Sequence, residues 1–356
     1  MNATRILRRP RVLIVGCGDV GLRCARRLLA RPAPPRVIAL TTRAARADQL
    51  RAEGVTPIVG NLDAPRTLRR LVGLAPTVLH LAPPPAHGDD DPRTRALIAA
   101  LGSRTRHRPA QQPAGAAVGR LRTHRRAVCP ASGPGQFAPR GGGTLTNGGI
   151  VPEAFSAAWP RARLRVVYAS TTGVYGDCAG ALIDETRPVR PANARAKRRV
   201  AAERRFRQAS ARGVMAASIV RIPGIYARER LPLARIVQGK PALVDADDVY
   251  TNHIHADDLA AIVLRVAMRG RAGRVVHASD DTVMKMGEYF DRVADAFGLP
   301  RVPRVTREAA QMMLDPATLS FMRESRRLSN ARLKRELGVA LRYPTVDDFL
   351  RGRRAP

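Results

Sequence analysis

A glycine-rich turn near the N-terminus constrains the fold of this chain more than any other feature of its sequence. The turn reads GCGDVG at residues 16–21, directly after the apolar run 12–15 and at the start of a helical stretch. Between a strand and a helix, the first glycine allows a tight bend and the second lets a pyrophosphate approach the backbone. The third packs the helix against the strand. The pattern therefore predicts a dinucleotide-binding site.

Short apolar runs alternate with helical stretches on both sides of a long interruption. We expect strands at 12–15, 36–41, 55–59, 77–81, 164–169, 214–221 and 274–277, and helices at 19–30, 44–52, 92–101, 192–211, 231–238 and 256–268. Alternation at this spacing predicts a parallel sheet with right-handed crossovers. The expected fold is α/β and Rossmann-like, a doubly wound parallel sheet, with a small, mostly helical C-terminal substrate lobe.

The interruption at residues 104–163 holds seven prolines, nine glycines and +9 of the net charge of +33. So little apolar surface cannot offset the entropy of ordering the chain, and we expect a disordered insert. It is either a low-complexity insertion or a local reading-frame error, or else an arm that binds nucleic acid or lipid. The expected organisation is a first part of the Rossmann domain at 1–103, the insert at 104–163, and the rest of that domain with the C-terminal lobe at 164–356.

The basic charge is spread along the whole chain. Of its 62 basic residues 58 are arginines, and only 4% of residues are aromatic and able to stack on bases. Specific nucleic-acid binding is therefore not expected, whereas non-specific attraction to polyanions is. The sequence has no apolar run of about 18 residues, no signal-peptide pattern and no metal-ligand spacing among its four cysteines. We expect a cytoplasmic protein without a membrane span or a metal site.

The end of the second expected strand bears on which dinucleotide binds. It reads LTTR at residues 40–43, without the carboxylate that would accept the ribose 2′-hydroxyl of NAD. Arg43 can pair with a 2′-phosphate, and Thr41 or Thr42 can donate a hydrogen bond to it. This favours NADP over NAD, with the alternative that Arg43 is one more surface arginine.

Further motifs resemble one known family. They are VVYASTTGVYGD at residues 166–177, RIPGIY at 221–226, NHIHADD at 252–258 and the closing stretch from SN at 329–330 to YP at 343–344. With the glycine turn, they resemble the NAD(P)-dependent epimerase/dehydratase family, the extended and atypical branch of the short-chain dehydrogenases/reductases. The resemblance covers nearly the whole chain except residues 104–163. It implies hydride exchange between a nicotinamide and a hydroxyl- or carbonyl-bearing substrate, such as a sugar nucleotide, and dimers are common in this family.

The family carries its chemistry on a Ser or Thr, a Tyr and a Lys. By the resemblance, Thr171 would hydrogen-bond the reacting oxygen and Lys197 would hold the nicotinamide ribose, but Asn193 stands at the tyrosine position. An amide cannot exchange a proton near neutral pH. Three interpretations stay open: Tyr175, on the same loop as Thr171, takes over, another group or a water does, or the chain is a non-catalytic dinucleotide-binding sensor or scaffold. Lys197 could also be merely solvated.

Other residues are expected around the same sheet edge. The resemblance places Asp63 near the adenine ring, with a helix N-cap as the alternative, and the stretch after the fourth strand lies where open α/β sheets bind ligands. His253 and His255 either touch ligand or brace the lobe, and Cys178 has no surroundings typical of a nucleophile. The expected cofactor residues are Gly16, Cys17, Gly18, Asp19, Val20, Gly21, Thr42, Arg43, Asp63, Leu81 and Ala82.

Overall fold

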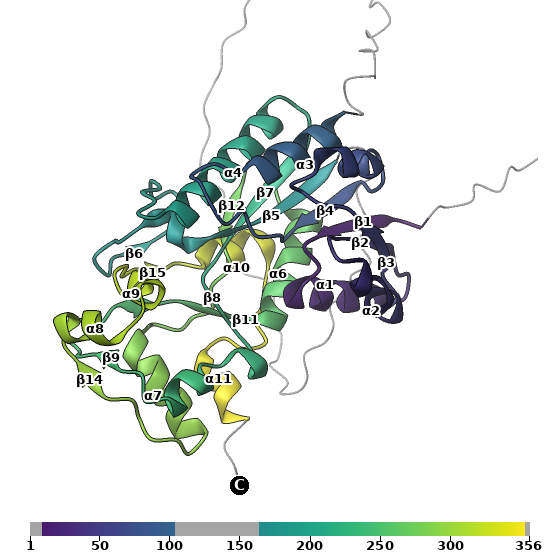
Figure 1. Ribbon diagram of the computed structural model, residues 1–356. Helices are drawn as coiled ribbons and strands as arrows, with labels where there is room; N and C mark the ends of the chain where they lie inside the picture. Colours follow the sequence, from purple (N-terminus) through teal and green to yellow (C-terminus); the bar gives the residue numbers. More distant parts are fainter. Residues whose placement is uncertain (1–8, 104–163, 353–356) are drawn as a thin grey trace, which may run out of the picture. The chain divides into compact units, whose positions relative to one another are not determined.

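The computed structural model describes residues 9–103 and 164–352, and a seven-stranded parallel sheet forms its centre (Figure 1). The strands are β1 (Arg11–Val15), β2 (Arg36–Thr41), β3 (Thr56–Val59), β4 (Thr77–His80), β5 (Arg165–Thr171), β7 (Ala216–Ile222) and β12 (Val275–His277). They lie in the order β12-β7-β5-β4-β1-β2-β3. The chain runs outward from β1 to β3 and then crosses back to β4, so the switch point lies between β1 and β4. The expected Rossmann-like fold is confirmed; the expected insert lies outside the described residues.

Alternate residues of the central strands face two separate cores. In β1, Val12 and Ile14 pack into one core and Leu13 and Val15 into the other, and all four are fully buried. A strand covered on both faces must be apolar throughout, which explains its continuous hydrophobic run. One face is covered by α1 (Asp19–Leu29), α6 (Ala256–Arg269) and α10 (Ala331–Leu337), and the other by η2 (Pro65–Leu71), α3 (Pro92–Gly102) and α4 (Ala194–Ala211).

A smaller lobe follows the sheet in the C-terminal half and has its own apolar cluster. Its helices are α5 (Leu233–Val237), α7 (Met286–Ala296), α8 (Arg307–Met313), α9 (Pro316–Phe321) and α11 (Val346–Arg351). Its strand pairs are β9 (Ala242–Leu243) with β14 (Arg304–Val305), and β10 (Tyr250–Thr251) with β13 (Met284–Lys285). Two further parallel pairs are β8 (Gly224–Tyr226) with β11 (His253–His255), and β6 (Leu182–Ile183) with β15 (Arg327–Leu328). Aromatic residues fill much of this cluster, including Tyr226, Tyr289 and Phe349.

The short strands are the main difference from the sequence-based expectation. A pair of two-residue strands leaves no alternating pattern to detect, so β13, β14 and β15 fall in a stretch expected to be mostly helical. The expected helix 44–52 begins as a separate 3₁₀ turn, η1 (Ala44–Arg46), before α2 (Ala47–Ala52). This turn places Arg46 at the carboxyl end of the sheet, beside Thr42.

Candidate functional site

The three glycines of the N-terminal turn are required for three different reasons. Gly16 has a φ of +92°, and a Cβ placed on it would lie 2.4 Å from the backbone nitrogen of Ala82. A Cβ on Gly21 would lie 2.9 Å from the Gly16 carbonyl oxygen, so α1 can approach the turn only without a side chain there. A Cβ on Gly18 would meet no atom within 4 Å. Packing within the protein does not require a glycine at position 18. The lack of a side chain there instead keeps the space above the turn open.

That space belongs to a cavity of about 530 Å³ over the carboxyl ends of β1, β2 and β4. Seven of the expected cofactor residues line it: Gly16, Cys17, Gly18, Thr42, Asp63, Leu81 and Ala82. Four expected cofactor residues do not line it: Asp19, Val20, Gly21 and Arg43. The bare backbone at Gly18 and the start of α1 offer amide groups to an anion, which fits the pyrophosphate of a dinucleotide.

Asp19 is held away from the cavity by arginines. Its carboxylate accepts hydrogen bonds from Arg23 Nε and Arg230 Nε, each at 2.7 Å. Arg23 also binds Asp257 at the start of α6, at 2.6 Å. The Asp19 carboxylate therefore joins α1 to the segment after β8, and a cofactor contact of Asp19 stays a prediction for its backbone N–H at the start of α1.

Arg46 lies where Arg43 was expected. Arg43 is exposed, and its backbone N–H donates to Thr41 Oγ1 at 3.3 Å, closing the bend after β2. The 3₁₀ turn η1 then reverses the chain, and Arg46 lines the cavity beside Thr42. A strand-end pattern cannot show this, because it identifies the end of β2 but not the path of the turn that follows.

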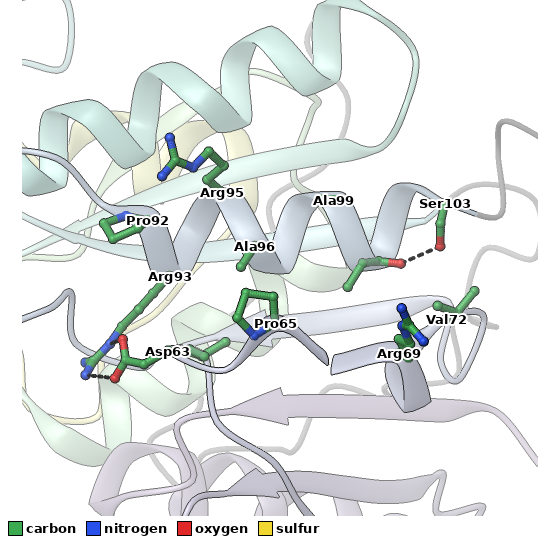
Figure 2. Close-up of a pocket in the computed structure, with 12 residues that line it drawn as sticks. Asp63, Pro65, Arg69, Val72, Pro92, Arg93, Arg95, Ala96, Ala99 and Ser103 are labelled. Atoms are coloured by element: carbon green, nitrogen blue, oxygen red, sulfur yellow. Dashed lines mark hydrogen bonds and ion pairs between the residues drawn. The ribbon is translucent and has the colours of Figure 1, made fainter. Parts of the chain in front are cut away.

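Asp63 forms one wall of the cavity and is paired with an arginine of α3. Arg93 Nη2 and Nε lie 2.6 Å and 2.7 Å from its two carboxylate oxygens, and these hydrogen bonds lower the pKa of Asp63. Figure 2 shows Arg93 reaching from α3 to Asp63 at the end of a neighbouring hollow of about 450 Å³. The N-cap of η2 is Ala64, so the alternative role of Asp63 as a helix cap is wrong.

Thr171 is the last residue of β5, and Asn193 immediately precedes α4. Thr171 is partly buried, and its Oγ1 accepts a long hydrogen bond of 3.4 Å from the Gly173 N–H, which leaves its own proton free to be donated. Asn193 is the N-cap of α4, with its Oδ1 accepting from the Ala196 N–H at 2.9 Å. Its Nδ2 donates to Glu324 Oε1 at 3.3 Å. The residue at the family's tyrosine position is therefore fixed by a helix cap and by a carboxylate.

Lys197 lies one helical turn after Asn193 and is exposed. Its Nζ pairs with Asp89 Oδ2 at 3.0 Å, in the loop that follows β4. Exposed pairs of this kind contribute about 0–1 kcal/mol, so a ribose hydroxyl can compete for the ammonium group at little cost. The position is compatible with the expected role of Lys197.

Tyr175 is in a buried polar network, not in a cleft. Its side chain is 1% exposed, and its hydroxyl accepts from Arg221 Nη1 at 2.6 Å and lies 2.5 Å from His277 Nε2. Glu203 binds the same Arg221 through both carboxylate oxygens and accepts from Ser170 Oγ at 2.6 Å. Burial raises the pKa of Tyr175 to about 12, far from that of a group exchanging protons near neutral pH. The expected acid/base role of Tyr175 is therefore not supported.

The two histidines of the NHIHADD stretch are also buried. His255 is the N-cap of α6 and packs against Tyr343 and Phe349, while His253 packs against Tyr289 with ring centroids 4.2 Å apart. Burial lowers the pKa of His253 to about 3 and that of His255 to about 4. Of the two interpretations left open, these contacts favour the structural one.

The cysteines near the cavity show no sign of reactivity. Cys17 is buried, and burial raises its pKa to about 11, so it stays a thiol. Within residues 9–103 and 164–352, no group of three His, Cys, Asp or Glu side chains could hold a metal ion. No helix in the same described ranges combines the length and apolar character needed to cross a membrane.

The sheet order, the glycine turn and the cavity above it define a Rossmann-type nucleotide-binding protein. Residues 12–75 match the TrkA-N domain, and residues 138–278 match the NAD dependent epimerase/dehydratase family. The match over residues 138–278 agrees with the family resemblance of the motifs. No curated protein matches the chain in sequence.

Solved structures share the fold over nearly the full length. A conserved protein of unknown function from Silicibacter pomeroyi is 24% identical with a TM-score of 0.67, covering 96% of this chain and 97% of that one. A dTDP-glucose 4,6-dehydratase from Streptomyces venezuelae, solved with NAD bound, is 19% identical with a TM-score of 0.65, covering 96% and 95%. A UDP-glucuronic acid 4-epimerase from Bacillus cereus, in complex with NAD, is 12% identical with a TM-score of 0.62, covering 96% of each chain. At these identities the likeness shows the fold.

Proposed function

We propose that this protein is an NAD(P)-dependent oxidoreductase or epimerase/dehydratase that exchanges hydride with a hydroxyl- or carbonyl-bearing substrate. The observation that carries the proposal is the open space over Gly18, inside a cavity of about 530 Å³ at the switch point of the sheet. The family match over residues 138–278 supports a nicotinamide dinucleotide as the occupant. Sugar nucleotides are the first substrate class to test, because two structural neighbours are named for them.

Each part of the cofactor has residues that fit it. The pyrophosphate would lie on the backbone at Gly18, and the adenosine half would lie between Thr42 and Asp63. Arg46 lines the cavity and Arg43 does not, so Arg46 would be the residue that pairs with a 2′-phosphate; this supports a preference for NADP. Lys197 would release the Asp89 carboxylate and bind the hydroxyl groups of the nicotinamide ribose. When bound, the nicotinamide supplies or accepts the hydride.

The substrate would meet the chain at the end of β5. Thr171 keeps a proton that it can donate to the reacting oxygen, since its hydroxyl oxygen accepts the Gly173 N–H. A hydrogen bond to a developing oxyanion stabilises the transition state more than the ground state.

A second candidate function is a non-catalytic dinucleotide-binding protein. Asn193 favours it, because the amide at the tyrosine position is engaged at both its oxygen and its nitrogen and has no proton to exchange. Both candidates predict cofactor binding. Only the first predicts turnover.

Calorimetric binding of NADPH and NADH to the full chain tests the proposal. At about 0.3 M salt, non-specific attraction between phosphates and surface arginines is strongly screened. Gly18→Ala should weaken binding at least tenfold, because the new methyl group enters the space of the pyrophosphate without touching the protein. Gly352→Ala is the matched control, since its Cβ would make only an ordinary 3.9 Å contact. Absence of binding by the wild-type protein, or equal binding by Gly18→Ala, would overturn the proposal.

A further inference from the structure

A carboxylate from the C-terminal lobe lies beside the residue at the tyrosine position. Glu324 follows α9 and is only 12% exposed, and its Oε1 accepts from Asn193 Nδ2 at 3.3 Å. Its other oxygen, Oε2, accepts from Arg326 Nη1 at 2.9 Å. Asn193 and Arg326 together fix the orientation of the carboxylate.

The same carboxylate and the Thr171 hydroxyl both lie beside Gly173. A Cβ placed on Gly173 would lie 3.8 Å from Glu324 Oε2 and 3.8 Å from Thr171 Oγ1. Because residue 173 has no side chain, no Cβ covers the Thr171 hydroxyl or the Glu324 carboxylate on this side. A substrate oxygen that approaches Thr171 past Gly173 would therefore also approach Glu324.

The backbone around Glu324 is firmly attached to the end of β5. Ser325 accepts backbone hydrogen bonds from Cys178 and Gly180, each at 3.0 Å, and Arg326 Nη1 donates to the Gly176 carbonyl at 2.8 Å. The next residues form β15, which pairs with β6 (Figure 1). A carboxylate held in this way meets the need for preorganisation at a reacting centre.

We propose that Glu324 takes over the proton transfer that the missing tyrosine would perform, an inference that rests on the proposed function. In the oxidation direction, the substrate alcohol gives its O–H proton to a Glu324 oxygen and its C–H hydride to the nicotinamide. The alcohol loses two electrons and becomes a carbonyl, NAD(P)⁺ becomes NAD(P)H, and Glu324 becomes a carboxylic acid. In the reverse direction the carboxylic acid returns the proton to the carbonyl oxygen. A carboxylate can accept this proton, whereas the amide of Asn193 cannot.

The kinetic test uses the full chain with NADPH and 9,10-phenanthrenequinone, an activated diketone whose reduction needs one hydride and one proton. Glu324→Gln should lower kcat by about 10²-fold or more, the range for loss of a positioned acid/base. The dissociation constant for NADPH should stay within twofold. Glu324→Asp should retain part of the rate, and adding Asn193→Tyr to Glu324→Gln should restore activity. Glu288→Gln is the matched control, because Glu288 pairs with Arg292 within α7.

A second measurement does not depend on turnover. With ¹³C-labelled glutamate carboxyl groups, the signal that disappears in Glu324→Gln identifies Glu324. Addition of NADPH should shift this signal and leave that of Glu288 unchanged.

The outcomes separate this inference from the proposed function. If the wild-type protein does not bind NADPH, the proposed function fails and the role of Glu324 falls with it. If NADPH binds but the Glu324 signal is unmoved, or if Glu324→Gln keeps the wild-type kcat, the role of Glu324 alone is overturned. If NADPH binds but the wild type reduces no quinone, the role of Glu324 is overturned and the result favours the non-catalytic candidate function. Thermal unfolding of each variant shows whether a loss of rate reflects a loss of folding.

Discussion

Arg221 Nη1 and the hydroxyl oxygen of Tyr175 lie 2.6 Å apart in the interior, and Arg221 is 1% exposed. The guanidinium is compensated by the two oxygens of Glu203 and by this phenol. Because the charge is buried, each of its partners matters more than a surface contact would. The network links β5, β7 and β12 directly beneath the end of β5 that carries Thr171.

Tyr175→Phe should therefore affect folding and not cofactor binding. It removes an acceptor from Arg221 and leaves His277 Nε2 without its partner, which should cost about 1–3 kcal/mol of the free energy of unfolding. Denaturant unfolding measures this cost, and NADPH affinity should be unchanged. Tyr250→Phe, at a partly exposed position, is the control and should stay within about 0.5 kcal/mol of the wild type. If Tyr175→Phe is as stable as the wild type but loses turnover, the result would support a catalytic role for Tyr175.

Cofactor preference should depend on Arg46. Arg46→Ala should weaken NADPH binding about tenfold or more while leaving NADH binding unchanged, because a charge-assisted hydrogen bond to the 2′-phosphate contributes about 1.5–3 kcal/mol. Arg43→Ala should alter neither, since Arg43 does not line the cavity. Calorimetric titration with both nucleotides distinguishes the two arginines. The reverse pattern would mean that the turn after β2 rearranges when the cofactor binds.

The ion pair between Lys197 and Asp89 should compete with the ribose. Asp89→Asn releases Lys197 and should tighten NADPH binding by a few-fold, the effect of removing an exposed pair contributing up to about 1 kcal/mol. Lys197→Met should weaken binding about tenfold. Asp90→Asn is the control, because Asp90 pairs with Arg205 farther along α4. Weaker binding of NADPH by Asp89→Asn would show that the pair holds the site together instead of competing with the ligand.

Stability should fall below neutral pH because several histidines are buried without charge. Burial lowers the pKa of His80 to about 3, against about 6.5 in the unfolded chain. The unfolded state therefore binds more protons between these values, and the free energy of unfolding falls as pH drops from about 6.5 toward 3. His80 alone contributes a slope of up to about 1.4 kcal/mol per pH unit. Denaturant unfolding at pH 7 and pH 5 should show a smaller loss for His80→Leu than for the wild type; equal losses would contradict the assignment.

The sheet and the glycine turn could be predicted because both leave strong local patterns. β1 is a continuous apolar run, and the spacing of Gly16, Gly18 and Gly21 has a physical reason at each position. Thr171 and Lys197 were located by motif, and the structure places them at the end of β5 and on α4. Their catalytic roles stay predictions.

Residues that depend on long-range packing could not be predicted. Tyr175 lies only four positions after Thr171, at the end of the 3₁₀ turn Thr172–Tyr175, yet its direction is set by Arg221 and His277, which come from other strands. Glu324 is 131 positions from Asn193, with which it shares a hydrogen bond, and no local pattern marks it. To place Arg46 in the cavity, one must know the path of the three-residue turn η1, and the sequence pattern at the end of β2 does not give that path.

The pairing of β15 with β6 has a consequence for the order in which a growing chain becomes complete. All the residues that line the cofactor cavity lie at positions 15–93, so they leave the ribosome early. Glu324 and β15 are made more than 200 residues later and must still reach β6 and the end of β5. During synthesis, the residues that line the cavity are therefore made first, and Glu324, the residue proposed for proton transfer, is made last.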